Sequence, residues 1–236
     1  MLRWIFILLV SLWTISCTDT VEDPSEPQIL LMGDSMMAFN RLSGNSVADH
    51  LQDRLGTNVI DRSVSGARLI YNLPVSGAAG MKIQSQYISG NWEWIVMNGG
   101  GNDILFGCGC GACDQRLDRL ISADGQTGVI PDAIRDLRAT GARVLYTGYL
   151  RTPGVNGPIE SCGPIGDEMD ARIARFAEND DGVVFVSLAE LVPFGDRSFH
   201  GLDLIHPSAK GSSAISAVIA ETIMNENQSI SFLTTM

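Results

Sequence analysis

Five short apolar segments, separated by longer segments with helical periodicity, constrain the fold of this chain most strongly. All five are rich in β-branched or aromatic residues and have the length of buried strands. They span residues 28–32, 58–64, 94–98, 143–149 and 183–188. Strands that alternate with helices indicate an α/β fold, in which right-handed crossovers place helices on both faces of a mostly parallel sheet. We therefore predict a three-layer α/β/α domain with a five-stranded sheet.

Four segments carry apolar residues at helical spacing. In the first, Asn45 is placed to cap a helix that Gly56 ends. A second begins near Pro131, a residue tolerated at the start of a helix, and ends at Gly141. The other two align Met169, Ile173 and Phe176, and, after Pro207, Ile215, Val218 or Ile219, and Ile223.

Length and composition fit one globular domain. The chain has 236 residues, of which 45% are hydrophobic and 18% charged, enough for one sizeable core. Its formal net charge is -11, from 27 acidic and 16 basic residues. This balance argues against a protein that binds nucleic acid by neutralising phosphates. We interpret the acidity as surface charge that keeps an exported protein soluble.

The N-terminal segment has the pattern of a secretory signal. Residues 1–17 place one Arg before an apolar stretch that is shorter than the roughly 20 residues of a membrane-spanning helix. Their ending, TISC, resembles a bacterial lipobox, which makes Cys17 a lipidation candidate; cleavage without lipidation and an uncleaved anchor are the alternatives. Residues 18–27 are acidic and contain proline, as expected of a tether before a domain at 28–236. We predict export to the periplasm or cell envelope, with membrane attachment through Cys17.

Four cysteines remain for the domain: Cys108, Cys110, Cys113 and Cys162. An even number in an exported protein suggests two disulfides, with three pairings among which the sequence cannot choose. A metal site with four thiolates and free thiols are the alternatives. An oxidising compartment and the lack of repeated two-residue spacers favour disulfides.

Small and polar residues follow four of the predicted strands. They are Gly33-Asp34-Ser35, Ser65-Gly66, the run from Gly99 to Asp103, and, beyond the fifth strand, the run from Asp203 to Pro207. In a parallel α/β sheet, ligands bind at the carboxyl ends of the strands. Glycine permits close approach of the backbone to a ligand, and Ser, Asn, Asp and His are the side chains of acyl-transfer sites. The order of these residues therefore predicts one shared pocket.

Each of these residues also has an ordinary structural interpretation. Ser35 could cap the helix that follows it, Asn102 and Asp103 could form a turn, and His206 could be a surface residue. Taken singly, each structural role is the better interpretation. The joint occurrence of all four segments at strand ends favours a catalytic site.

The four segments resemble the signature blocks of the SGNH, or GDSL-type, hydrolases, a superfamily of esterases and lipases. GDS at 33–35 is similar to the first block, Gly66 falls at the glycine of the second, GGND at 100–103 is similar to the third, and DLIH at 203–206 to the fifth. Residues 62–65 lack the asparagine that family members commonly carry before the second-block glycine. The resemblance covers the chain from Gln28 to the last helix and implies a flavodoxin-like fold.

The resemblance also implies a triad, with Ser35 as nucleophile, His206 as base and Asp203 to orient the imidazole. A serine hydroxyl needs a base to remove its proton, and an ordinary histidine, with a pKa of about 6.5, is mostly neutral at pH 7. His200 is an alternative base. Only His206, however, has a carboxylate three residues before it.

An oxyanion hole is implied by the same resemblance. Its donors would be the backbone NH groups of Ser35 and Gly66 and the side-chain amide of Asn102. Asp34 and Asp103 are expected to hold the neighbouring turns together through backbone hydrogen bonds rather than to act in catalysis.

The sequence therefore predicts a carboxylic ester hydrolase that needs no metal and no organic cofactor. Its expected partners are a small ester or an acylated glycan or lipid, and no nucleic acid. Deacetylases, lysophospholipases and thioesterases all occur among the hydrolases that the chain resembles. Met36, Met37 and Phe39 could line an acyl pocket, although packing in the core is the preferred interpretation. The alternative function is an inactive envelope lipoprotein that serves as a binding or scaffold module.

Overall fold

A computed structural model describes residues 28–155 and 157–234. The predicted signal segment, tether and lipidation candidate Cys17 lie outside the described residues. The chain forms one five-stranded sheet with the order β2-β1-β3-β4-β5, and every neighbouring pair is parallel. The strands are β1 (Gln28–Met32), β2 (Val59–Asp61), β3 (Trp92–Met97), β4 (Arg143–Thr147) and β5 (Val183–Val186). The flavodoxin-like α/β prediction is confirmed.

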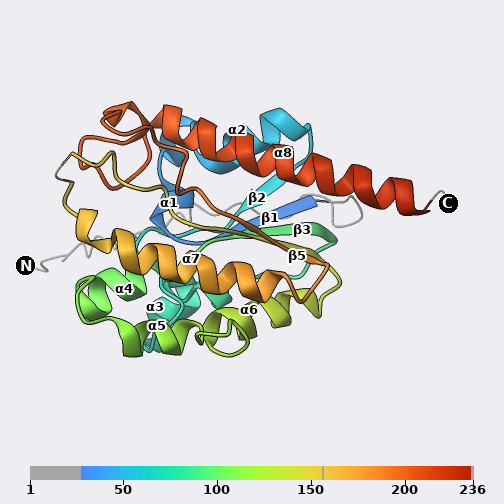
Figure 1. Cartoon of the computed structure of the whole chain (residues 1–236). Coiled ribbons are helices and arrows are strands. Elements are labelled where there is room, and N and C mark those ends of the chain that lie inside the picture. The colour runs from blue at the N-terminus through green and yellow to red at the C-terminus, as the bar shows by residue number, and fades with distance from the viewer. Residues whose placement is uncertain (1–27, 156, 235–236) are drawn as a thin grey trace, which may run out of the picture.

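Helices cover both faces of the sheet (Figure 1). One face carries α1 (Ser35–Ala38), α2 (Val47–Leu55) and α8 (Ala209–Thr234). The other carries α4 (Gly101–Cys108), α5 (Asp114–Leu120), α6 (Val129–Arg138) and α7 (Gly163–Ala177). Short turns of helix, α3 (Pro74–Ser76), η1 (Arg41–Ser43), η2 (Gly77–Met81), η3 (Ile83–Gln86), η4 (Glu160–Cys162) and η5 (Arg197–Phe199), lie in the connections.

The core has two layers because side chains alternate along each strand. In β1, Leu30 and Met32 pack with the α4–α7 side, whereas Ile29 and Leu31 pack with the α2–α8 side. All four side chains are buried, as expected for a parallel strand that is covered on both faces. Because every neighbouring pair is parallel, the carboxyl ends of all five strands lie at the same edge of this buried sheet.

Several predicted boundaries differ from the structure. Ser46 rather than Asn45 caps α2, because the Ser46 hydroxyl accepts from the Asp49 NH while the Asp49 carboxylate accepts from the Ser46 NH. Strand β2 ends at Asp61, whose carboxylate accepts from the NH and hydroxyl of Ser63 and so forms a turn. Helix α6 ends at Arg138, before Gly141. In the described ranges, no helix has the length and apolar character needed to span a membrane.

Candidate active site

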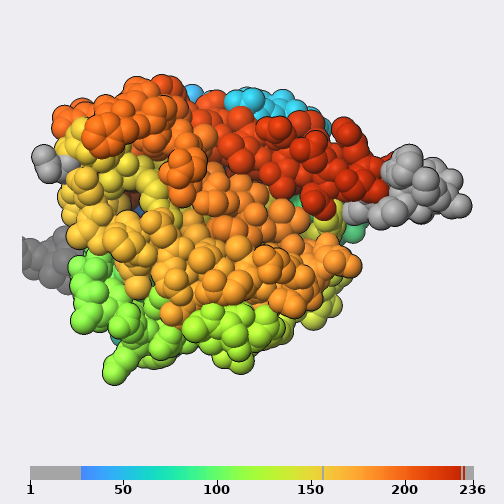
Figure 2. Space-filling view, viewed as in Figure 1, coloured from blue at the N-terminus to red at the C-terminus, as the bar shows by residue number. Residues whose placement is uncertain are grey.

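Ser35, Gly66, Asn102 and His206 line one cavity at the carboxyl edge of the sheet. Ser35 is the first residue of α1, Gly66 lies in the loop after β2, Asn102 is the second residue of α4, and His206 lies in the loop before α8. The cavity has a volume of about 650 Å³. Figure 2 shows a hollow near this end of the molecule, among the yellow atoms of the segment after β4. The structure thus brings together the residues that the sequence predicted to share a pocket.

The turn that presents Ser35 depends on Gly33. Gly33 has a φ of +148°, and a Cβ on this residue would lie 1.8 Å from Oδ1 of Asn98. Asn98 cannot move aside freely, since its Oδ1 accepts from the Asp34 NH at 3.1 Å and its Nδ2 donates to Asp34 Oδ1 at 2.9 Å. The Gln86 amide accepts from the Gly33 NH at 2.7 Å and donates to the Gly33 carbonyl at 2.8 Å. The backbone before Ser35 is therefore held by two buried amide side chains.

Asp34 caps the helix that Ser35 begins. Its Oδ1 accepts from the Met36 NH at 3.0 Å, so the capping role that Ser35 could have filled belongs to its neighbour. The Tyr149 hydroxyl donates to Asp34 Oδ2 and accepts from the Gly101 NH. Burial raises the pKa of Asp34, and the hydrogen bonds from Tyr149, Asn98 and the Met36 NH oppose this shift. Through Tyr149, the turn after β1 is coupled to the start of α4.

The start of α4 is tied to the loop that holds Gly66. Asn102 Nδ2 donates to the Ala67 carbonyl at 3.0 Å, which leaves its second N–H available to a ligand. The Asp103 carboxylate accepts from the NH groups of Leu69 at 2.9 Å and Ile70 at 2.8 Å. Burial raises the pKa of Asp103, and these two NH groups oppose the shift. Asp103 therefore has the bracing role that the sequence indicated.

His206 is paired with Asp203. Its Nδ1 lies 2.7 Å from Asp203 Oδ2, while Asp203 Oδ1 accepts from the NH groups of Ile205 and His206 at 3.0 Å each. Burial alone would raise the pKa of Asp203, but the hydrogen bonds from His206 and these NH groups lower it overall. Asp203 therefore stays ionised near neutral pH and leaves Nε2 of the imidazole for the cavity. The ring of Phe39 stacks on His206 with a centroid distance of 4.4 Å, which fixes its plane.

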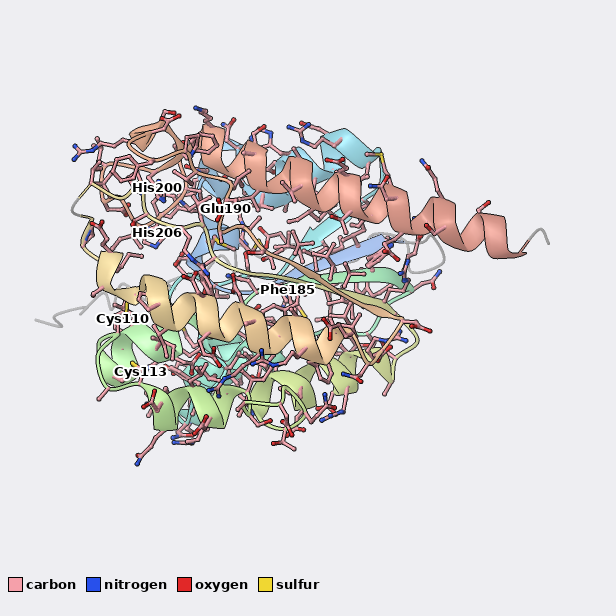
Figure 3. The ribbon with its side chains drawn as sticks, viewed as in Figure 1. Cys110, Cys113, Phe185, Glu190, His200 and His206 are labelled. Carbon is pink, nitrogen blue, oxygen red and sulfur yellow. A yellow bond between two sulfur atoms is a disulfide. The ribbon has the colours of Figure 1, made fainter. Side chains whose placement is uncertain are left out.

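His200 has a different place. It does not line the cavity, its side chain is buried, and its backbone forms an isolated bridge with Pro207. Burial lowers the pKa of His200. Figure 3 labels both histidines in the segment before α8. The geometry favours His206 over His200 as the histidine of the site.

The four cysteines of the domain form two disulfides, Cys108–Cys113 and Cys110–Cys162. The second joins the loop after α4 to the start of α7, and both of its residues line the cavity. A thiolate metal site and free thiols, the two alternatives, therefore do not describe these cysteines. Within residues 28–155 and 157–234, no group of three or more His, Cys, Asp or Glu side chains is placed to hold a metal ion.

Sequence reasoning missed Gln86, Asn98 and Tyr149, which hold the turn before Ser35. Asn98 and Tyr149 are the last residues of two predicted strands, and their position at strand ends was the available signal. The apolar residues near Ser35 divide between two roles. Met37 is fully buried in the core on the α2–α8 side, whereas Met36 and Phe39 also line the cavity.

Solved structures with the same fold include several hydrolases. A protein from Slackia heliotrinireducens described as an SGNH hydrolase aligns with a TM-score of 0.58 and 23% identity, over 84% of this chain and 98% of its own. A GDSL-like lipase from Bacteroides thetaiotaomicron aligns with a TM-score of 0.57 and 18% identity, over 84% and 88%. A carbohydrate esterase family 2 enzyme from Corynascus thermopiles aligns with a TM-score of 0.58 and 15% identity, over 89% and 69%. No curated protein matches this chain.

The family is established by sequence. Residues 31–214 match the model of the GDSL-like Lipase/Acylhydrolase family, and this match covers most of the chain. The chain belongs to this family, and the resemblance carried by its short motifs is thereby confirmed.

Proposed function

We propose that this protein is a serine esterase that cleaves carboxylic esters through an acyl-enzyme. The observation that carries the proposal is the arrangement of the cavity: Ser35 and Asn102 line it together with His206, whose far ring nitrogen is bound by Asp203. A scaffold that bound its partner without turnover would have no need for a paired carboxylate and imidazole in the same cavity as a serine hydroxyl. Family membership supports the hydrolase class.

In the acylation step, Ser35 Oγ forms a bond to the carbonyl carbon of the ester. Its proton passes to Nε2 of His206, and the imidazolium is stabilised by the Asp203 carboxylate. The tetrahedral intermediate then breaks the bond between the carbonyl carbon and the alcohol oxygen, which takes the proton from His206. In deacylation, a water molecule attacks the Ser35 ester with His206 again as base. The products are the free acid and the alcohol, and Ser35 is regenerated.

The oxyanion of each intermediate would be held by the backbone NH groups of Ser35 and Gly66 and by the free N–H of Asn102. The bond from Asn102 to the Ala67 carbonyl supports this role because it fixes the amide without using both of its hydrogens. Ser35 also starts a helix, and the NH groups at a helix start favour negative charge. Donors that are fixed before the reaction cost no reorganisation when charge develops.

Hydrolysis of short-chain nitrophenyl esters tests the proposal. We expect the mature protein to release nitrophenol and the Ser35→Ala variant to lose nearly all of this activity. Ser65→Ala is the matched control. It removes a hydroxyl from the same cavity, in the loop that holds Gly66, at a serine that is not the proposed nucleophile. Equal activity of wild type and Ser35→Ala, or no activity in wild type at any acyl length, would exclude the triad. The second result would leave a binding module as the function.

We also propose that the protein acts outside the cytoplasm, held to a membrane by a lipid on Cys17. The signal pattern of residues 1–17 and the two disulfides support this location. Fractionation of cells that express the full chain and a Cys17→Ala variant tests it. Wild type should partition with membranes and the variant should not; recovery of both in the soluble fraction would refute the anchor.

A further inference from the structure

The wall of the cavity on the α4–α7 side is apolar. It is formed by Ile104, Leu105, Phe106, Ile159, Ile165 and Met169. Ile104 and Met169 belong to the buried core under this face, whereas Phe106 is 65% exposed and stands at the rim. The wall therefore runs from a solvent-accessible edge to the core of the domain.

Two charged side chains, Arg151 and Glu160, also line this mostly apolar wall, and both already have partners. Arg151 forms ion pairs with Asp167 at 2.8 Å and with Asp170 at 2.9 Å. Glu160 accepts from the Gly157 NH at 3.0 Å. A glycan would need hydrogen-bond partners for its hydroxyl groups, and this wall offers few besides Thr152 and the exposed Glu160. Its chemistry fits a hydrocarbon chain better.

The orientation of an ester follows from the proposed function, on which this inference rests. His206 donates its proton to the alcohol, so the alcohol part must lie on the His206 side. His206 and the stacked ring of Phe39 lie next to α8 and α1 in the chain, and these helices pack on the α2–α8 face. The acyl part then extends from Ser35 in the other direction, past Asn102 toward Ile104. Figure 3 shows His206 above the start of α7 and Cys110 below it.

The Cys110–Cys162 disulfide bounds this acyl side, since both residues line the cavity and join the end of α4 to the start of α7. A cavity of about 650 Å³ is far larger than an acetyl group requires. It falls within the range of about 300–1,000 Å³ that is typical of sites for drug-sized ligands. We propose that the α4–α7 wall is an acyl-chain site that selects esters of medium-chain fatty acids over acetate esters.

A chain-length series with one leaving group tests the proposal: nitrophenyl acetate, butyrate, octanoate and dodecanoate. Each buried methylene adds about fourfold to kcat/KM, so octanoate should exceed acetate by about 60-fold if half of its six additional methylenes are buried. Leu105→Trp and Ile165→Trp narrow the wall at two partly buried positions. Each should lower the octanoate-to-acetate ratio by about 16-fold, the loss of two buried methylenes, while acetate hydrolysis stays within about threefold.

The control is Leu73→Trp, an equal change at an exposed leucine outside the cavity, which should leave the ratio unchanged. A thermal unfolding transition checks that each variant has folded. Two tryptophan variants are used so that the test still stands if one of them does not fold. Acetate as the best substrate of wild type would overturn the acyl-chain site but leave the esterase intact. Equal losses on acetate and octanoate in both folded variants would also overturn it. An absence of hydrolysis at every chain length would refute the proposed function itself.

Discussion

Removal of the two disulfides one at a time should destabilise the protein by unequal amounts. A disulfide restricts the unfolded chain by an amount that grows with the logarithm of the loop it closes, and the sequence separations here are 52 residues for Cys110–Cys162 and 5 for Cys108–Cys113. The chain-entropy relation gives about 4 kcal/mol for the longer loop and about 2 kcal/mol for the shorter. In a protein of this size, 1 kcal/mol corresponds to roughly 2–4 °C in Tm. The expected losses are therefore about 8–16 °C and about 4–8 °C.

The double variants Cys110→Ser/Cys162→Ser and Cys108→Ser/Cys113→Ser should be compared by circular dichroism melts in the absence of reductant. Each variant keeps the other disulfide and serves as its control. The second comparison is the ratio of the hydrolysis rates of nitrophenyl octanoate and nitrophenyl acetate, measured at a temperature below the unfolding transitions of both variants. Because Cys110 and Cys162 line the cavity, only their removal should change the ratio of the two rates.

Which of the two variants loses more Tm tests the loop-closure argument. A larger loss of Tm from the 108–113 pair than from the 110–162 pair would refute the loop-closure argument. If neither pair changed Tm or the octanoate-to-acetate ratio, the disulfides would have no part in holding the loop beside the site.

Three further predictions concern the turn before Ser35, the proposed oxyanion donor Asn102 and the proposed triad residue Asp203. Gly33→Ala should lower the free energy of unfolding by about 3–5 kcal/mol in urea titrations, from backbone strain and the displaced Asn98 amide. Gly141→Ala, with a φ of +95° and open space around it, should cost only about 1–2 kcal/mol. Asn102→Ala should lower kcat by about 100-fold to 1,000-fold with little change in KM, in steady-state kinetics on a nitrophenyl ester. The pKa of Asp203 is lowered by folding, so its stabilisation is present above its unfolded pKa and is lost as the pH falls below about 4. Wild type and Asp203→Asn should therefore differ in urea stability at pH 7, and this difference should shrink as the pH falls below about 4.

Each of these has a contrary outcome. Equal costs for the two glycine variants would mean that the contact with Asn98 is unimportant. A rise in KM with unchanged kcat would assign Asn102 to ground-state binding rather than to the oxyanion. A stability difference between wild type and Asp203→Asn that persists unchanged at pH 3 would show that ionisation of Asp203 is not its source.

The sheet was predictable because its strands are buried on both faces and read as continuous apolar runs. The strand ends were less predictable, since they depend on side-chain hydrogen bonds. The Asp61 carboxylate ends β2 by accepting from Ser63, whereas the predicted strand extended to Val64. The choice of Ser46 over Asn45 as the helix cap likewise depends on a reciprocal bond with Asp49.

The gathering of Ser35, Asn102 and His206 in one cavity was predictable from their order along the chain, whereas the residues that hold them in place were not. Ser35, Asn102 and His206 each lie in a short motif that follows a predicted strand. Gln86 and Tyr149 reach the same turn from positions that are 53 and 115 residues away from the groups they bind. Tyr149 had only its position at a predicted strand end as a signal, and Gln86 had none, because these contacts exist only once the sheet has formed.

The three acidic residues beside the site show how the fold divides similar side chains between charge and bracing. Asp34 and Asp103 are buried under the cavity edge, where burial raises the pKa of each carboxyl and their hydrogen bonds go to backbone and neutral side chains. Asp203 lies in a loop with 41% of its side chain exposed, and its net pKa shift is downward. Only Asp203 contacts the imidazole of His206, so the carboxylate that most favours its charge is the one placed to stabilise an imidazolium. In the proposed esterase mechanism, a buried carboxyl with a raised pKa at the position of Asp203 would stabilise the imidazolium of His206 less well than Asp203 does.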